Sequence, residues 1–321
     1  MAAVSNASAP EIVELRHLRE ADIEPLLDEE GLTWRSLFNW DASASSDLVR
    51  RFVRIQALNG FALMRGGRVI GYSYYVIEDR KALIGDLYLT REFATVDNED
   101  LLLAAVLQTL LNTPYLQRVE AQLLMMHGPF ERPMPFSRFV KVHPRNFMVV
   151  ELADAAGLPE GRAVHTHGFE SWHERRQDEA ARLIARSYEG HVDATINDQY
   201  RSVSGAKRFL LNIVQYPGCG SFFGPASHVA FDAYGSLSGI SLASLVSAEA
   251  GHITQICVAP EDRSTGVGYE LMRRSLVSLA EHGCDKTSLT VTASNQAAIR
   301  LYQQMGFRAM RRFAAYVWED F

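Results

Sequence analysis

The chain has 321 residues, of which 47% are hydrophobic and 22% charged, and its formal net charge is -6. That length exceeds one ordinary compact core, so two domains of roughly 150 residues each are expected. The acidic balance and the lack of a long Lys/Arg run argue against nucleic acid as the main partner. No apolar run reaches the roughly 18 residues that a bilayer span needs, so no membrane partner is expected either.

The N-terminus and the cysteines bear on the compartment. Residues 1–10 lack the basic start and the apolar stretch of a signal peptide. The three cysteines, Cys219, Cys257 and Cys284, are widely spaced and odd in number, which fits neither a disulfide framework nor a metal site. A reducing cytoplasm and a protein without a bound metal are therefore expected.

The order of predicted elements is the same in the two halves: two helices, a strand pair, an apolar helix and a further strand. In the first half they are expected at Glu20–Glu29, Ser46–Leu58, Tyr72–Ile77, Ala82–Leu89, Glu99–Leu111 and Gln117–Met125. In the second half they are expected at Glu174–Ser187, Ser204–Gln215, Ile240–Val246, His252–Val258, Gly268–His282 and Lys286–Ala293.

A pair of glycines opens the strand pair in each half, Gly67 with Gly71 and Gly235 with Gly239, about half a chain length apart. Two such short matches can arise by chance, but the shared order of elements favours a duplicated fold. Strands followed by helices, with the early strands antiparallel, predict an α/β fold with a mixed sheet in each half.

The segment 153–162 is rich in Ala, Gly and Pro and is the best candidate for a linker. It divides the chain into two expected domains, residues 1–155 and residues 163–321.

The clearest chemical signal follows the second strand pair. Pro260 ends the strand His252–Val258, the turn Arg263–Gly268 follows, and an apolar helix begins at once. Such a turn suits an anion, because free N–H groups and the helix dipole point toward it. Gly266 and Gly268 lack side chains, so a pyrophosphate can approach the backbone closely.

This segment resembles the acetyl-CoA motif of the GCN5-related N-acetyltransferase (GNAT) family, Val-x-Pro-x-x-Arg-x-x-Gly-x-Gly. The matching residues are Val258, Pro260, Arg263, Gly266 and Gly268. The family's second signature is also matched further along the chain, at Asn295, Ala298, Leu301, Tyr302, Gly306 and Phe307. Two motifs in the right order make the resemblance specific.

The resemblance implies two tandem acyl-CoA N-acyltransferase-like domains, with acetyl-CoA as co-substrate of the second. The residues implied to bind it are Ile256, Cys257, Val258, Arg263, Ser264, Thr265, Gly266, Val267, Gly268 and Asn295. The first half has no such motif, since acidic residues crowd its corresponding turn: Glu92, Asp97, Glu99 and Asp100. It is expected to be a degenerate copy, which either shapes the substrate site or is an inert structural domain.

Two residues are candidates for catalysis. In the resembling family a tyrosine at the position of Tyr302 lies near the sulfur, where a phenol can protonate the departing thiolate. His252 is expected to share one strand face with Thr254, Ile256 and Val258. An imidazole there is a candidate general base near neutral pH, directly or through water. A core tyrosine and a catalytically idle histidine are the structural alternatives.

The resemblance implies an N-acetyltransferase that acts on a primary amine. The acceptor, a small molecule or a peptide, is not specified, because Asp193, Asp198 and Tyr200 fit either an acceptor wall or helix caps. Two alternatives stay open: a CoA-sensing or interaction protein, and an aminoacyl-tRNA-dependent peptidyltransferase with the same duplicated fold. The oligomeric state also stays open.

Overall fold

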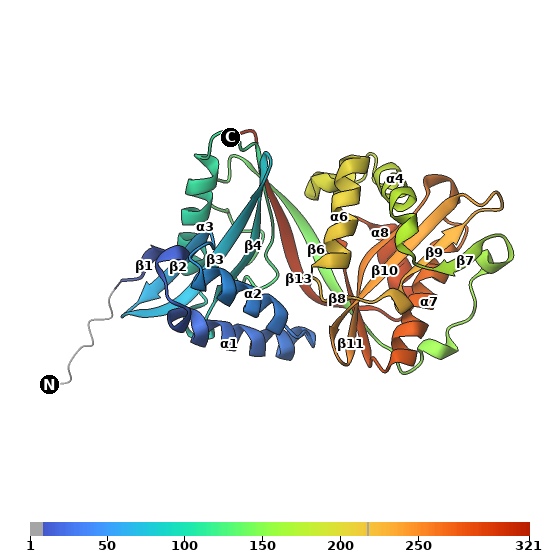
Figure 1. Ribbon diagram of the computed structural model, residues 1–321, viewed down its shortest axis with the longest axis horizontal. Helices are drawn as coiled ribbons and strands as arrows, with labels where there is room; N and C mark the ends of the chain where they lie inside the picture. The colour runs from blue at the N-terminus through green and yellow to red at the C-terminus, as the bar shows by residue number, and fades with distance from the viewer. Residues whose placement is uncertain (1–8, 217) are drawn as a thin grey trace. The chain divides into compact units, whose positions relative to one another are not determined.

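The computed structural model describes residues 9–216 and 218–321. The expectation about the N-terminal residues 1–8 lies outside this range. The chain folds into two compact units (Figure 1). Unit 1 comprises residues 1–37, 42–144 and 313–321, and unit 2 comprises residues 38–41 and 145–312. None of the helices in the described residues is long and apolar enough to cross a bilayer.

Unit 1 contains a mixed sheet in the order β1-β2-β3-β4-β5-β13, in which only β4 and β5 are parallel. Helix α3 packs against β2, β3 and β4. The elements are β1 (Glu11–Glu14), α1 (Glu20–Phe38), α2 (Ser43–Arg54), β2 (Gly60–Arg65), β3 (Arg68–Glu78), β4 (Lys81–Leu89), α3 (Val96–Leu111) and β5 (Arg118–Gln122).

Unit 2 repeats this plan in the order β6-β12-β11-β10-β9-β7, and only β11 and β12 are parallel. Its strands are β6 (Val140–Glu151), β7 (Gly168–Ser171), β8 (Ser221–Phe222), β9 (His228–Phe231), β10 (Leu237–Ser247), β11 (Ala250–Val258), β12 (Lys286–Thr292) and β13 (Arg308–Glu319). Its helices are α4 (Gln177–Ser187), α5 (Asp193–Ile196), α6 (Val203–Gln215), α7 (Val267–His282) and α8 (Gln296–Gln304).

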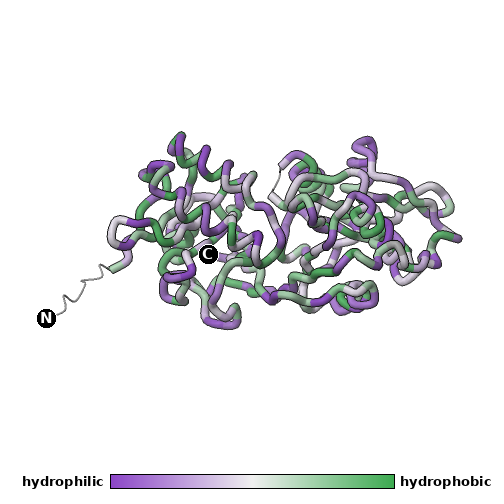
Figure 2. The backbone as a smooth tube through the Cα atoms, turned by 90° about the horizontal axis from the view of Figure 1, so that it is seen from below, coloured by the Kyte–Doolittle hydropathy of each residue, from purple (hydrophilic) through white to green (hydrophobic). Residues whose placement is uncertain are grey.

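The mixed α/β fold expected in each half is confirmed, and the predicted strand pairs and apolar helices are all present. Local signals explain their ends. Helix α7 ends at Gly283, whose φ of 101° suits the left-handed cap that glycine adopts without strain. Asn295 caps α8 by accepting a hydrogen bond from the Ala298 N–H at 3.2 Å. Figure 2 shows that apolar and polar stretches alternate along the backbone in both parts of the chain.

The boundaries of the two units differ from the expected division into residues 1–155 and 163–321. Strand β6 begins in unit 1 and continues from Arg145 in unit 2, where it pairs with β12. Strand β13 begins in unit 2, and from Phe313 it belongs to unit 1, where it pairs with β5. Each unit therefore depends on a strand segment from the other half of the chain.

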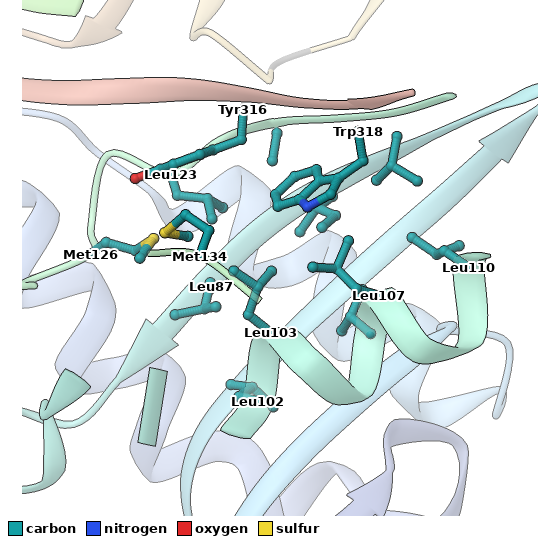
Figure 3. Packing of buried hydrophobic residues seen from close by; sticks show 14 of the residues in the cluster. Leu87, Leu102, Leu103, Leu107, Leu110, Leu123, Met126, Met134, Tyr316 and Trp318 are labelled. Carbon is teal, nitrogen blue, oxygen red and sulfur yellow. The ribbon is translucent and has the colours of Figure 1, made fainter. Parts of the chain in front are cut away.

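The core of unit 1 shows this dependence directly. Trp318 of β13 lies over Leu103 and Leu107 of α3, and Tyr316 lies beside Leu123 and Met126 in the same cluster (Figure 3). Trp318 is fully buried, and its indole Nε1–H donates to the Pro135 carbonyl at 3.1 Å. The last strand of the chain thus completes the core of the unit that its first residues begin.

We predict that Trp318→Ala destabilises unit 1 by about 3–5 kcal/mol, because it leaves a large cavity in that core. Hydrogen exchange should become faster in α3 and β4 and stay unchanged in α7. Trp172→Ala is the matched control, since Trp172 is buried in a core cluster of unit 2. It should give the opposite pattern. Equal acceleration of exchange in both units by either variant would contradict the assignment of β13 to unit 1.

Candidate functional site

Strand β11 carries a β-bulge at Thr254. Gln255 pairs with Leu242 of β10, and Ile253 pairs with the next residue, Ala243, so Thr254 has no partner in the ladder. The parallel pairing with β12 also stops here, at Ile253 opposite Leu289. From Thr254 onward one edge of β11 is therefore without a neighbouring strand.

The bulge changes which side chains share a face, because one extra residue reverses the alternation along a strand. Ile253 and Ile256 pack in the core beneath α7 and α8, and Val258 packs with the first turn of α7. Cys257 lies in the core beneath α4 and α6. The expectation that His252 shares a face with Ile256 and Val258 is therefore wrong. His252 lies instead on the face of Gln255 and Cys257.

Backbone groups of β11 line its unpaired edge. The carbonyl oxygens of Ile256 and Val258 accept hydrogen bonds from the Tyr188 hydroxyl at 3.4 Å and the Ser187 hydroxyl at 3.2 Å. Both donors come from the end of α4. Cys257, between them, pairs with Ile240 of β10. Burial raises the pKa of the Cys257 thiol to about 12, so this cysteine stays protonated and is a poor nucleophile.

The turn from Arg263 to Gly268 lies at the end of that edge. Ser264 and Gly266 adopt positive φ angles of 62° and 103°, and α7 begins at Val267. Within the described residues, the N–H groups of Gly266, Val267 and Gly268 donate to no protein acceptor. Free N–H groups at the start of a helix are able to hydrogen-bond to an anion.

The other side chains of the turn make internal contacts. The Arg263 guanidinium donates to the Ser187 carbonyl at 2.6 Å, which caps α4. The Thr265 hydroxyl donates to the Asp262 carbonyl at 2.6 Å. A Cβ atom at Gly268 would lie 3.5 Å from Val258 and 3.6 Å from Leu301, so this glycine lets α7 lie close to β11 and α8.

Arg162 supports the turn from a segment that the sequence marks only as a linker. Its Nε donates to the Thr265 carbonyl at 3.0 Å, and its Nη2 donates to the Ser264 carbonyl. These two hydrogen bonds tie the turn to the segment that precedes β7. Nothing in the local sequence predicts this contact, because about a hundred residues separate the partners.

His252 is buried in an aromatic setting. Its ring centroid lies 5.0 Å from that of Trp40 and 6.3 Å from that of Phe147, and its Nδ1 lies 2.8 Å from the Ser288 hydroxyl. Burial, with a contribution from the charge of Arg145, lowers the pKa of His252 to about 4. The imidazole is therefore neutral at physiological pH and holds a proton less readily than an ordinary histidine.

Tyr302 lies on the buried face of α8 and is 6% exposed. Burial, and then the charge of Asp193, raise the pKa of its phenol above the ordinary value, so the hydroxyl stays protonated. Asn295 lies two turns earlier, at the N-cap of α8, and its Nδ2 is 3.4 Å from His191 Nε2. The structure thus brings Tyr302, Asn295 and Asp193 into one neighbourhood of unit 2.

Unit 1 has a corresponding β-bulge, also where the parallel pairing ends, but the side chains around it differ. Gly85 is the bulged residue of β4, and the pairing of β4 with β5 stops at Ile84. Asp86, the next residue, hydrogen-bonds to Glu30 of α1, and burial raises the pKa of both carboxyl groups. The α3 start is also occupied locally, since the Thr95 hydroxyl accepts from the Asn98 N–H at 3.3 Å.

Comparison with known proteins agrees with this geometry. Residues 172–307 match the model of the Acetyltransferase (GNAT) family. A tandem GNAT protein from the clavulanic acid biosynthesis pathway has the same fold, with a TM-score of 0.62 and 17% identity over 97% of this chain and 98% of that one. A GCN5-related N-acetyltransferase from Sphaerobacter thermophilus gives a TM-score of 0.63 at 15% identity over 97% and 95% of the two chains.

Two curated relatives match short stretches. A mycothiol acetyltransferase of Thermobispora bispora is 40% identical over 57 residues, which cover 18% of this chain and 19% of the relative. The N-alpha-acetyltransferase MAK3 of Arabidopsis thaliana is 34% identical over 68 residues, 21% of this chain and 36% of the relative. These matches span well under half of either relative. Residues 172–307 thus match the GNAT acetyltransferase family, and the whole chain shares the fold of a tandem GNAT protein.

We predict that Gly266→Ala weakens acetyl-CoA binding at least tenfold, measured by calorimetric titration. The φ of 103° disfavours a side chain, and a Cβ atom would lie 3.0 Å from Arg162 Cγ. Gly283→Ala is the matched control, because Gly283 has a similar φ of 101° at the other end of α7 and no atom within 4 Å of its Cβ position. Similar loss of affinity in both variants would show general destabilisation and contradict the prediction.

Proposed function

We propose that unit 2 transfers an acetyl group from acetyl-CoA to a primary amine by direct attack. One observation carries the proposal: the unpaired edge of β11 leads to the free N–H groups at the start of α7. An extended thioester arm needs main-chain partners, and a pyrophosphate needs a helix start without bulky side chains.

The donor would be held largely by backbone groups. Ile256, Cys257 and Val258 would pair with the pantetheine arm, with the Ser187 and Tyr188 hydroxyls giving up their bonds to the strand. The pyrophosphate would lie on the turn formed by Arg263, Ser264, Thr265, Gly266, Val267 and Gly268. Asn295 would fix the start of α8 beside the thioester.

Unit 1 would bind no CoA under this proposal. Its turn carries acidic residues where unit 2 has glycines, and Glu99 near the start of α3 is fully buried. A pyrophosphate there would meet negative charge in place of free N–H groups.

Calorimetric titration with acetyl-CoA, followed by thiol-release assays on a panel of amines, tests the proposal. One binding site and amine-dependent release are expected. Two equivalent sites would contradict the assignment of unit 1. Binding without release by any amine would favour a CoA sensor over an enzyme.

Tyr302 is proposed to protonate the departing thiolate, since its phenol is neutral and lies on α8 beside the open edge. We predict that Tyr302→Phe lowers kcat by about 10²–10⁴-fold while the acetyl-CoA affinity stays within twofold of the wild type. Tyr234→Phe serves as the control, because Tyr234 is 94% exposed. An unchanged rate of Tyr302→Phe at saturating substrate would refute the role.

His252 is proposed to start the proton path from the amine as a neutral hydrogen-bond acceptor, through water. We predict that His252→Ala lowers kcat, and that the loss is the same at every pH from 6 to 9. The reason is that a group with a pKa of about 4 does not change its protonation in that range. Full turnover of the variant, or a wild-type inflection near pH 6.5 that the variant lacks, would contradict this role. Acetyl-CoA titration of the variant checks that it is folded.

A further inference from the structure

Three hydroxyl groups on one face of β12 form hydrogen bonds to three polar side chains from other elements. Ser288, Thr290 and Thr292 alternate along the strand and therefore point to the same side of the sheet. Ser288 bonds to His252 at 2.8 Å, Thr290 accepts from Arg145 Nη2 at 3.2 Å, and Thr292 donates to Asp193. Neighbouring hydroxyls on such a face are about 6.6 Å apart. A neutral base, a cation and an anion thus line one face.

Arg145 has no counterion in the described part of the chain. No carboxylate lies within 4.0 Å of its guanidinium, and its Nε is buried without a hydrogen-bond partner. Arg145 is half-buried, and a buried Nε–H without an acceptor is costly unless a ligand atom completes its hydrogen bonding. The charge of Arg145 also counteracts the rise in the pKa values of Tyr200 and Tyr302, so its guanidinium lies within electrostatic reach of both phenols.

Asp193 supplies the opposite charge in that space. Its Oδ2 lies 3.7 Å from His191, and it adds to the rise in the pKa values of Tyr200 and Tyr302. Two stacked tyrosine rings, Tyr188 and Tyr200, with centroids 4.3 Å apart, form an adjacent wall. Gln255 joins them, since it donates to the Tyr188 hydroxyl at 3.0 Å and accepts from that of Tyr200 at 3.2 Å.

We infer that the acceptor is an amine with a carboxylate beside it, as in an α-amino acid. Arg145 binds the carboxylate through the free Nε–H, and Asp193 attracts the ammonium group before it loses its proton. This inference rests on the proposed acetyl transfer. The amine nitrogen forms a bond to the acetyl carbon, the carbon–sulfur bond breaks, one proton leaves the amine and one reaches the sulfur. The carboxylate takes no part in that step.

The test compares the common amino acids with their α-carboxamides in the thiol-release assay. The wild type should prefer the acid of a matched pair, such as L-phenylalanine over L-phenylalaninamide, by about 10- to 100-fold in kcat/KM, the range of one charge-assisted hydrogen bond. Arg145→Gln should abolish this preference by lowering the value for the acid alone. Arg145→Lys should keep part of it. Arg182→Gln, at an exposed position of α4, should change nothing.

The outcomes separate the inference from the proposed function. Equal use of acids and carboxamides by the wild type would overturn the inference and leave the acetyl transfer intact. An equal loss on both substrates in Arg145→Gln, with acetyl-CoA affinity unchanged, would assign Arg145 to the reacting acyl group and also overturn it. Acetyl-CoA binding without release by any amine would reject both proposals.

Discussion

The unpaired edge of β11 begins at a β-bulge, where this strand has one residue more than its partner β10. At Thr254 the ladder with β10 skips a residue, and at Ile253 the ladder with β12 ends. Without the bulge, β11 would present Gln255 to the core beneath α7, where an amide without a partner is costly. With it, Gln255 reaches the hydroxyls of Tyr188 and Tyr200. One local irregularity thus opens the backbone and orders the side chains around it.

The same irregularity in unit 1 shows that the backbone was kept while the chemistry changed. There the bulged residue is Gly85, and the Tyr74 ring fills the place of a side chain: a Cβ atom would lie 2.1 Å from it. The residue after the bulge is Asp86 in unit 1 and Gln255 in unit 2. Asp86 interacts with Glu30, whereas Gln255 bonds to the two tyrosine hydroxyls in unit 2. Burial raises the pKa of both acids, which favours their protonated forms and lowers the charge of the pair.

What the sequence predicts well is local. The strand–turn–helix from His252 to His282 and the capped helix after Asn295 are encoded by adjacent residues, so their elements and the free N–H groups follow from the motifs. The bulge was missed, because Thr254 is as ordinary in a strand as its neighbours. Its consequence for the face of His252 was missed with it, and so was the effect of burial on the pKa of that residue.

The supporting side chains were missed for a different reason: they come from the other half of the chain. Trp40 stacks near His252, Arg145 bonds to Thr290, and Arg162 holds the turn at Ser264, and all three precede residue 163. Residues 163–321 contain both family motifs but none of these contacts, and they lack β6, the neighbour of β12. They also carry the segment of β13 that completes the core of unit 1. The duplicated halves therefore cannot be exchanged or separated as independent domains, since each unit folds around residues that the other half supplies. This mutual dependence gives the first half a structural role although the CoA-type motif stands in the second half alone.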